Sequence, residues 1–220
     1  MALVLYNYFR SSASYRVRIA LALKKLDYDY LPVHLVKNEQ LAPAFRAVAP
    51  SQLVPALVVD DAASGAPATL TQSLAIIEYL DETVPEPPLL PADALGRARV
   101  RAIALDIACE IHPLDNLRVL RYLQGELKVA DDDKNRWYRH WIETGLEVVE
   151  RQLAGHRATG RFCHGDTPGL ADCVLVPQIF NARRMDTRLD HVPTVMRVFE
   201  ACMAEPAFAS TQPSACPDAT

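Results

Sequence analysis

The sequence has no apolar run near the roughly 20 residues that a helix needs to cross a bilayer. Its first residues, Met1 to Tyr8, also lack the basic region and the small-residue cleavage site of a secretory signal. Half of the residues are apolar and 23% are charged, which is typical of globular proteins. We therefore expect a cytoplasmic protein with no membrane partner.

The sequence lacks any cysteine pattern typical of disulfide bridges or metal sites. The chain has five cysteines, an odd number, and none of them form a short paired motif. This pattern argues against a disulfide framework and against a structural zinc site. We expect reduced thiols and no bound metal.

Positive charge is not in excess, because 23 basic residues stand against 27 acidic ones, for a net charge of −4. A net acidic protein is a poor partner for nucleic acid. Arginines nevertheless gather locally, and their planar guanidinium groups suit carboxylates and phosphates. A small anionic ligand is expected. The arginine-rich stretches are residues 10–18, 97–101, 118–121 and 183–188.

A proline-rich stretch divides the chain. Residues 85–91 hold four prolines in seven positions and read as a semi-rigid connector. We predict a domain over residues 1–84, a linker over 85–91 and a second domain over 92–220. There is no internal repeat and no low-complexity tract.

The first domain alternates β-type and helical patterns. The order strand, helix, strand, helix-like segment, two strands and helix predicts a βαβ unit followed by ββα, an α/β arrangement. Ser73 is expected to cap the last of these helices. The expected strands are 3–8, 28–35, 55–60 and 69–71, and the expected helices are 15–25 and 73–84.

The second domain is predicted to be all-helical. A long helix from about Leu95 should kink at Pro113 and resume afterwards, because proline removes one backbone donor while the apolar spacing continues. The next helix begins near Asp131, and further helices are expected over 170–185 and 193–204. The face of the Asp131 helix is expected to carry Trp137, Trp141, Thr144 and Val148.

Three short segments carry candidate chemistry. Residues 10–18 join a strand to a helix, where serine hydroxyls and helix amides favour an anion. In residues 52–55, a cis Val54–Pro55 bond would turn the Val54 main chain outward to pair with an extended peptide. In residues 71–74, a glutamine and a serine open a helix and suit a carboxylate. Ordinary capping and an ordinary trans proline are the alternatives.

Together these fragments resemble zeta-class glutathione transferases, the family of maleylacetoacetate isomerase, with maleylpyruvate isomerase as a close relative. The resemblance starts at Ser11 to Leu21 and includes Val54 to Leu57 and Gln72 to Leu80. It continues through Ile111 to Leu120 and Leu170 to Gln178, and it ends with a Pro-Asp pair near the C-terminus. It covers nearly the whole chain. It implies a thioredoxin-like N-terminal domain and an all-α C-terminal domain, which together make the glutathione-transferase fold.

The resemblance also implies roles for single residues. Glutathione is the implied cofactor, with Ser11 donating to its sulfur and Ser12 beside it. Arg10 and Arg184 are implied to bind a dicarboxylate substrate. The implied glutathione-binding residues are Gln40, Val54, Pro55, Gln72, Ser73 and His112.

Three positions depart from the family pattern. Ala13 stands where a cysteine is usual, and His112 stands where many members have glutamine. Gly169 stands where a serine or threonine usually caps a helix, so we expect that helix to lose a side-chain acceptor at a cost of a few tenths of a kcal/mol.

The implied reaction is cis–trans isomerisation of a maleyl dicarboxylate, most consistent with maleylacetoacetate isomerase in aromatic amino-acid catabolism. The glutathione thiolate would add to the cis double bond, permit rotation and leave again. The alternatives are maleylpyruvate isomerisation, general transfer to small electrophiles such as α-haloacids, and a non-enzymatic scaffold on the same fold. The family implies a homodimer.

Overall fold

The computed structural model describes residues 2–61 and 65–219, which form two compact units. The first unit comprises Met1–Pro88 together with Glu205–Thr220, and the second comprises Leu89–Ala204.

One mixed sheet is the centre of the first unit. Its strand order is β2-β1-β3-β4, with β1 parallel to β2 and antiparallel to β3, and with β3 antiparallel to β4. This topology confirms the βαβ unit followed by ββα that the sequence predicts. The strands are β1 (Leu3–Asn7), β2 (Asp29–Pro32), β3 (Ala56–Asp61) and β4 (Ala66–Thr71).

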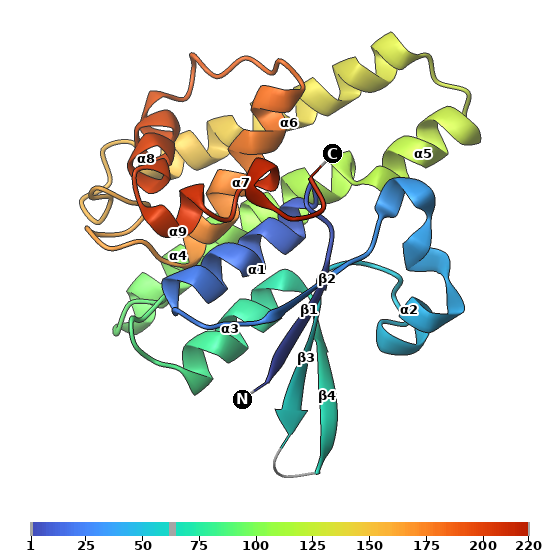
Figure 1. Ribbon diagram of the computed structural model, residues 1–220. Helices are drawn as coiled ribbons and strands as arrows, with labels where there is room; N and C mark the ends of the chain where they lie inside the picture. The colour runs from blue at the N-terminus through green and yellow to red at the C-terminus, as the bar shows by residue number, and fades with distance from the viewer. Residues whose placement is uncertain (1, 62–64, 220) are drawn as a thin grey trace. The chain divides into compact units, whose positions relative to one another are not determined.

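Helices cover both faces of this sheet. The helices are α1 (Ser12–Leu23), α2 (Pro43–Val48) and α3 (Ser73–Thr83). Figure 1 shows α1 and α3 on one side of the sheet and α2 on the other. On the α2 side, Phe45 packs in a buried cluster with Tyr8, Phe9 and Val54. This cluster links α2 to the ends of β1 and to the start of β3.

The strand register brings three distant segments to one edge of the sheet. Tyr6 near the end of β1 pairs with Ala56 at the start of β3, and Ala56 also pairs with Thr71 at the end of β4. The loop after β1, the loop before β3 and the loop after β4 therefore all leave the sheet at the same end.

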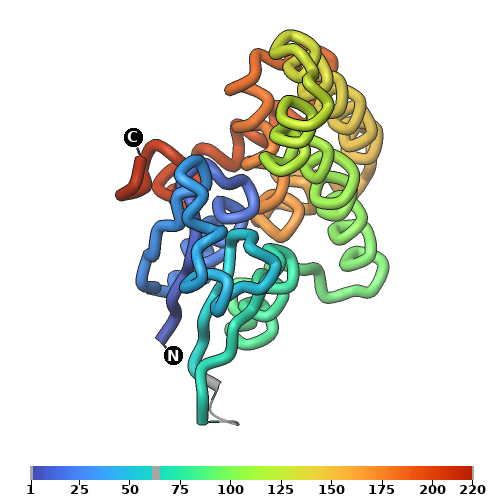
Figure 2. Tube along the Cα trace, turned by 90° about the vertical axis from the view of Figure 1, so that its right-hand side faces the viewer, coloured from blue at the N-terminus to red at the C-terminus, as the bar shows by residue number. Residues whose placement is uncertain are grey.

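The C-terminal segment packs in the first unit, whereas the sequence pattern assigned it to the helical domain of residues 92–220. Its short helix α9 (Pro206–Ala209) buries Phe208 completely. Tyr15 Oη of α1 donates to Phe208 O at 2.9 Å, and Arg18 Nε donates to Thr211 O at 3.1 Å. Figure 2 shows this red segment alongside the blue start of the chain. The sequence pattern gave no indication of this partner.

The second unit is all-helical, as predicted. Its core is α7, because every residue from Leu170 to Ile179 is buried. The N-cap Gly169 N–H donates to Asp172 Oδ2 at 2.9 Å. The helices are α4 (Ala94–Leu105), α5 (Leu117–Gly125), α6 (Asp131–Leu153), α7 (Leu170–Arg184) and α8 (Pro193–Met203).

The predicted kink at Pro113 is instead a full interruption. After α4 the chain forms a π-helical segment, η3 (Asp106–Ile111), and a 3-10 turn, η4 (His112–Asp115). Asn116 is extended, and its Oδ1 accepts from Arg118 N at 3.1 Å, which caps α5. A local side-chain cap therefore restarts the helix, so the backbone ladder does not continue through the proline.

The prediction for the inner face of α6 was wrong, because the buried residues lie about one position after the predicted ones. The buried residues are Tyr138, Ile142, Leu146, Val149 and Leu153, whereas Thr144 and Val148 are exposed. Trp137 and Trp141 are only half-buried. Large aromatic side chains dominate an apolar periodicity pattern. They can nevertheless lie at the edge of the buried face of a helix, with a polar ring atom hydrogen-bonded.

Candidate functional site

The bend after β1 holds Ser11 at the N-cap of α1. Its backbone N–H donates to Tyr8 O at 2.9 Å, and its Oγ accepts from Ser14 N at 3.2 Å. A hydroxyl that accepts this bond still has its own proton to donate. Capping and hydrogen bonding to a ligand are therefore compatible at Ser11. Ser12, the first helical residue, is buried.

The first turn of α1 is electrostatically suited to an anion. It contains no acidic side chain. Within the described residues, the amide of Ala13 makes no backbone or side-chain hydrogen bond. The positive end of the helix dipole adds to this preference.

Buried charges hold the bend in place. Arg18 is 1% exposed and donates to Asn7 Oδ1 and to Phe9 O, both at 3.0 Å. Asp218 accepts from Phe9 N at 3.3 Å and from the Tyr30 hydroxyl. Burial, followed by the Asp218 hydrogen bond, raises the pKa of Tyr30, so its hydroxyl stays a donor. The Pro-Asp pair of the resemblance thus anchors the loop before Arg10.

Val54 and Pro55 lie at the same edge of the sheet. Their peptide bond is cis, as expected from the resemblance. Strand β3 begins only at Ala56. Among residues 2–61 and 65–219, the amide and carbonyl of Val54 form no backbone hydrogen bond. These two groups can therefore pair with an extended peptide.

Gln72 and Ser73 open α3, but the N-cap is Gln72 and not Ser73, which the sequence predicted. Gln72 is the N-cap, is exposed and has a φ of 68°, a left-handed conformation that is uncommon for a side-chain-bearing residue. Ser73 is the first helical residue, and its Oγ accepts from Arg16 Nη1 at 3.3 Å. Backbone strain of this kind concentrates at functional sites.

Arg16 is the residue that sequence reasoning missed. Its guanidinium is buried, with 2% of the residue exposed, and it joins α1 to the start of α3. A buried cation at a helix N-terminus strongly favours an anionic ligand. In the sequence, Arg16 lies between the apolar residues Tyr15 and Val17, and this position could have indicated that its side chain is buried.

Gln40 is a buried polar residue in the first unit that is suited to a polar ligand. It lies in the short turn η2 (Glu39–Leu41) and is 7% exposed. Its Oε1 has no hydrogen-bond partner in the described part of the chain. A buried amide oxygen without a donor is costly, so it fits a ligand that brings an N–H group. Glutathione has such groups.

Arg10 is exposed on the same loop. Its Nη2 donates to Tyr8 Oη at 3.1 Å, and its guanidinium lies over the Phe9 ring at 4.9 Å. The side chain is thus supported without a carboxylate partner among the described ion pairs.

His112 and Arg184 belong to the second unit. His112 is half-buried in η4, and Arg184 is exposed in the last turn of α7. Arg184 Nη2 donates to Tyr138 Oη at 3.3 Å. Burial raises the pKa of Tyr138 to about 12.

Asp115 follows His112 in the same turn and is also unusual. It is 7% exposed, and neither carboxyl oxygen has a hydrogen-bond partner among the described residues. Burial raises its pKa to about 8, so it is mainly a neutral acid at pH 7.

Two further observations concern ligand and membrane classes. Across residues 2–61 and 65–219, no group of three or more histidine, cysteine or acidic side chains could hold a metal ion. None of the helices in these ranges is long and apolar enough to cross a membrane. The five cysteines are thiols and not disulfides, and Cys109 is exposed whereas the other four are buried.

Comparison with known proteins matches both parts of the chain to one family. Residues 10–83 match the model of the glutathione S-transferase N-terminal domain, and residues 135–204 match that of the C-terminal domain. The chain is 47% identical to a probable maleylacetoacetate isomerase of Vibrio cholerae serotype O1, covering 100% of this chain and 99% of that protein.

Solved structures agree with this match. A holo maleylpyruvate isomerase, described as a bacterial zeta-class glutathione S-transferase, has a TM-score of 0.93 at 46% identity and covers 99% of this chain and 100% of its own. The maleylacetoacetate isomerase of Anaeromyxobacter dehalogenans, with glutathione bound in its active site, has a TM-score of 0.90 at 45% identity over 100% and 98% of the two chains. The chain therefore belongs to the glutathione S-transferase family, and within it to the zeta-class group that includes the maleylacetoacetate and maleylpyruvate isomerases.

Proposed function

We propose that this protein is a glutathione-dependent enzyme that isomerises a maleyl dicarboxylate from cis to trans, with maleylacetoacetate as the first candidate substrate. The proposal is carried by one arrangement in the first unit. The α1 N-terminus, the unpaired main chain of Val54 and the strained start of α3 meet at one edge of the sheet.

Each glutathione contact in the proposal uses a different group of the chain. The Val54 amide and carbonyl pair with the cysteinyl backbone, next to Pro55. Gln72, Ser73 and the α3 N-terminus hold the γ-glutamyl carboxylate, with the Arg16 charge behind Ser73. Gln40 and His112 bind toward the glycyl end. These are the contacts that a small anionic peptide needs.

Bound glutathione supplies a thiolate, which can add reversibly to an activated double bond. Ser11 donates its hydroxyl proton toward that sulfur, and the α1 dipole favours its negative charge. Lowering a thiol pKa by two units requires about 2.7 kcal/mol. A charged hydrogen bond of about 1.5–3 kcal/mol and a dipole contribution of about 0.3–1 kcal/mol together reach that value. Ser12 supports the same position.

The substrate carboxylates are assigned to Arg10 and Arg184. The aromatic support of Arg10 and the Tyr138 hydrogen bond to Arg184 limit the side-chain entropy that each guanidinium loses on binding. An arginine that is already oriented binds a planar carboxylate at lower entropic cost.

The test is an absorbance assay of the purified protein with maleylacetoacetate or maleylpyruvate, with and without glutathione. We expect isomerisation only when glutathione is present. Maleylpyruvate is the alternative substrate, because the chain is similar to maleylpyruvate isomerases. Faster turnover of maleylpyruvate than of maleylacetoacetate would favour this alternative. Conjugation of an α-haloacid without isomerisation would instead indicate a general transferase, and no glutathione binding would indicate a scaffold.

Ser11 variants test the catalytic assignment. Ser11→Ala should lower kcat by about tenfold to a hundredfold, because a hydrogen bond to a charged group is lost, while glutathione affinity stays near the wild-type value. Ser11→Asp retains a cap acceptor but, when ionised, has no proton to donate to the sulfur, so it should share the kinetic loss without the loss of helix stability. Wild-type turnover in both variants would exclude Ser11 from the mechanism.

We also propose a cytoplasmic homodimer acting in aromatic catabolism. The support is the family resemblance. Light scattering of the purified protein should give a mass of about twice 24.4 kDa, and a monomeric mass would contradict the dimer.

A further inference from the structure

A basic pocket in the second unit lies outside every residue assigned above. It is formed by the first turns of α4, the end of α6 and the loop that follows, and its volume is about 660 Å³. Typical small-molecule sites have about 300–1,000 Å³. Its polar wall contains Asp93, Arg99, Gln152, His156, Arg157 and His164. The pocket is therefore large enough for a small organic molecule.

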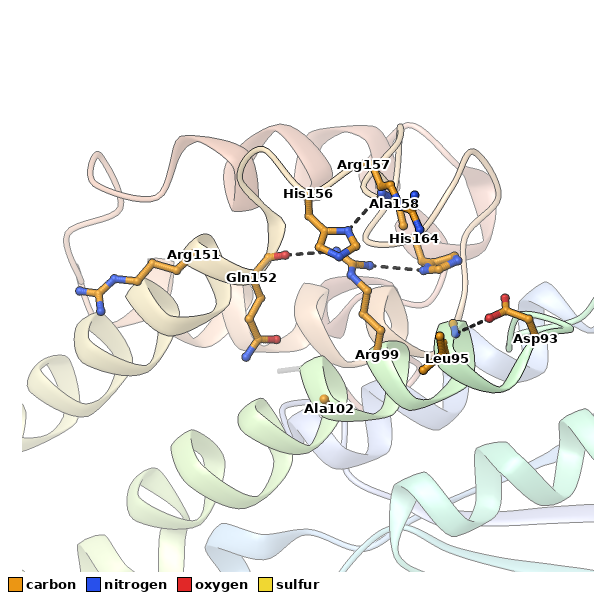
Figure 3. A pocket seen from close by; sticks show the side chains of 11 residues that line it. Asp93, Leu95, Arg99, Ala102, Arg151, Gln152, His156, Arg157, Ala158 and His164 are labelled. Carbon is orange, nitrogen blue, oxygen red and sulfur yellow. Dashed lines mark hydrogen bonds between the residues drawn. The ribbon is translucent and has the colours of Figure 1, made fainter.

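Arg99 gives this pocket a fixed positive charge, which no carboxylate in the described part of the chain contacts directly. Its Nη1 donates to Cys163 O at 2.7 Å, and its Nη2 donates to Thr159 Oγ1 at 2.8 Å and to Gln152 O at 3.2 Å. All three acceptors are neutral. Figure 3 shows the guanidinium of Arg99 between Gln152 and His164. These bonds hold the guanidinium at the bottom of the pocket. Because the acceptors are neutral, they offset its positive charge only partly.

Two imidazoles present donors beside Arg99. His156 Nδ1 accepts from Ala158 N at 3.1 Å. His164 Nδ1 lies 3.3 Å from Arg99 Nη1, and an arginine can only donate, so this nitrogen is also the acceptor. In the neutral state the proton of each ring is therefore on Nε2. Burial, followed by the Arg99 charge, lowers the pKa of His164.

Arg157 adds a second cation at the rim. It is exposed and forms no hydrogen bond or ion pair with the described residues. Arg151, in contrast, pairs with Glu147 and points away from the other cations in Figure 3. The one acidic side chain of the wall, Asp93, accepts from Gly96 N at 2.7 Å as the α4 N-cap. Donors thus outnumber acceptors in this pocket.

We propose that this pocket is a second binding site, specific for a phosphate-bearing small molecule. The free donors are the two imidazole Nε2–H groups and the Arg157 guanidinium, which come from two positions of one loop. The four Nη N–H groups of Arg99 already bond to the protein, so Arg99 contributes its charge. That arrangement suits a tetrahedral oxyanion with several acceptor oxygens better than a single planar carboxylate. The volume exceeds that of inorganic phosphate, and Leu95 and Ala102 provide apolar surface for an organic group. The inference is independent of the proposed isomerase activity.

The experiment measures pyrophosphate binding to the full-length protein without glutathione. Calorimetry should detect one saturable site per chain. The double variant with Arg157→Ala and His164→Gln should weaken binding at least tenfold. Both replaced side chains lie on the loop, and Arg99 is retained because its bonds tie that loop to α4. The matched control Arg136→Ala removes an equal charge from the exposed side of α6 and should stay within twofold of wild type.

A second readout distinguishes a site from general charge attraction. Saturation with pyrophosphate should raise the pKa of His164, followed by its ring signals in NMR, because an anion stabilises the imidazolium. His140, which is exposed on α6, should not shift. No saturable binding, equal weakening in the control variant, or equal displacement by malonate would overturn the assignment to phosphate.

Discussion

Ser11 illustrates how one side chain can serve both stability and chemistry. Its Oγ accepts the Ser14 amide, so it caps α1, while its own proton remains available for a ligand. From the sequence, capping and function were competing explanations. Because a hydroxyl is both donor and acceptor, the local geometry satisfies them together.

Arg184 has the clearest prediction for substrate selectivity. Arg184→Ala should raise KM for maleyl dicarboxylates about tenfold or more, since a carboxylate loses its cation, and should change KM for a neutral electrophile much less. Tyr138→Phe, which removes the hydrogen bond that supports Arg184, serves as the control and should give a smaller change of the same kind. Equal effects on charged and neutral substrates would argue against a carboxylate contact.

Asp115 predicts a pH dependence of stability. Its pKa rises from 3.8 in the unfolded chain to about 8 in the folded protein, so the folded state binds more protons between these values. The neutral Asp115 carboxyl therefore contributes fully to the free energy of unfolding below about pH 4. This contribution is lost as the pH rises through 8.

Asp115→Asn mimics the neutral acid. Relative to wild type, its free energy of unfolding should be similar near pH 4 and higher by on the order of a few kcal/mol near pH 8.5. Urea denaturation at the two pH values measures this difference. Parallel stability profiles of the two proteins would show that Asp115 is ionised in the folded state.

At the scale of the helix, Gly169 corrects an expectation from the sequence. The loss of a serine cap was expected to cost a few tenths of a kcal/mol. In the structure, a Cβ at this position would lie 2.8 Å from Leu89 O, and Asp172 still accepts the Gly169 amide. Close backbone approach is thus a reason for glycine here.

The replacement Gly169→Ser should therefore destabilise the protein by about 1 kcal/mol, because the overlap outweighs the gained cap. Gly169→Ala introduces the same Cβ without the hydroxyl and should be worse by about another 1 kcal/mol. Thermal unfolding of the three proteins measures both steps. A serine variant more stable than wild type would show that the Leu89 backbone moves aside easily.

Elements were predictable to different degrees. β1, β3, α3, α7 and α8 lie within a few residues of their predicted positions, because their apolar periodicity and local boundaries agree. The inner face of α6 was predicted wrongly, and a kink was predicted where the helix is fully interrupted before α5. Both depend on which neighbour a helix meets, and on a side-chain cap that competes with the backbone ladder.

At the scale of the molecule, the C-terminal segment is part of the N-terminal unit. Phe208→Ala should lower the free energy of unfolding by about 3–5 kcal/mol, since a fully buried ring is removed. Hydrogen exchange should show lost protection in α1, whose Tyr15 bonds to Phe208 O. Val36→Ala, at a 58% exposed site, is the control and should have little effect. Unchanged protection in α1 would mean that this packing is not stabilising.

Local sequence patterns were enough to predict the order of elements, the all-helical second part and the fragments that carry the family resemblance. These follow from local periodicity, turn residues and spacing, which do not depend on distant contacts. Three features became visible only in the folded chain: Arg16 contacts Ser73, Asp218 anchors the Phe9 loop, and basic side chains surround a pocket at α4. Each of these joins residues far apart in the chain, and strand register and burial, which arise only on folding, bring them together.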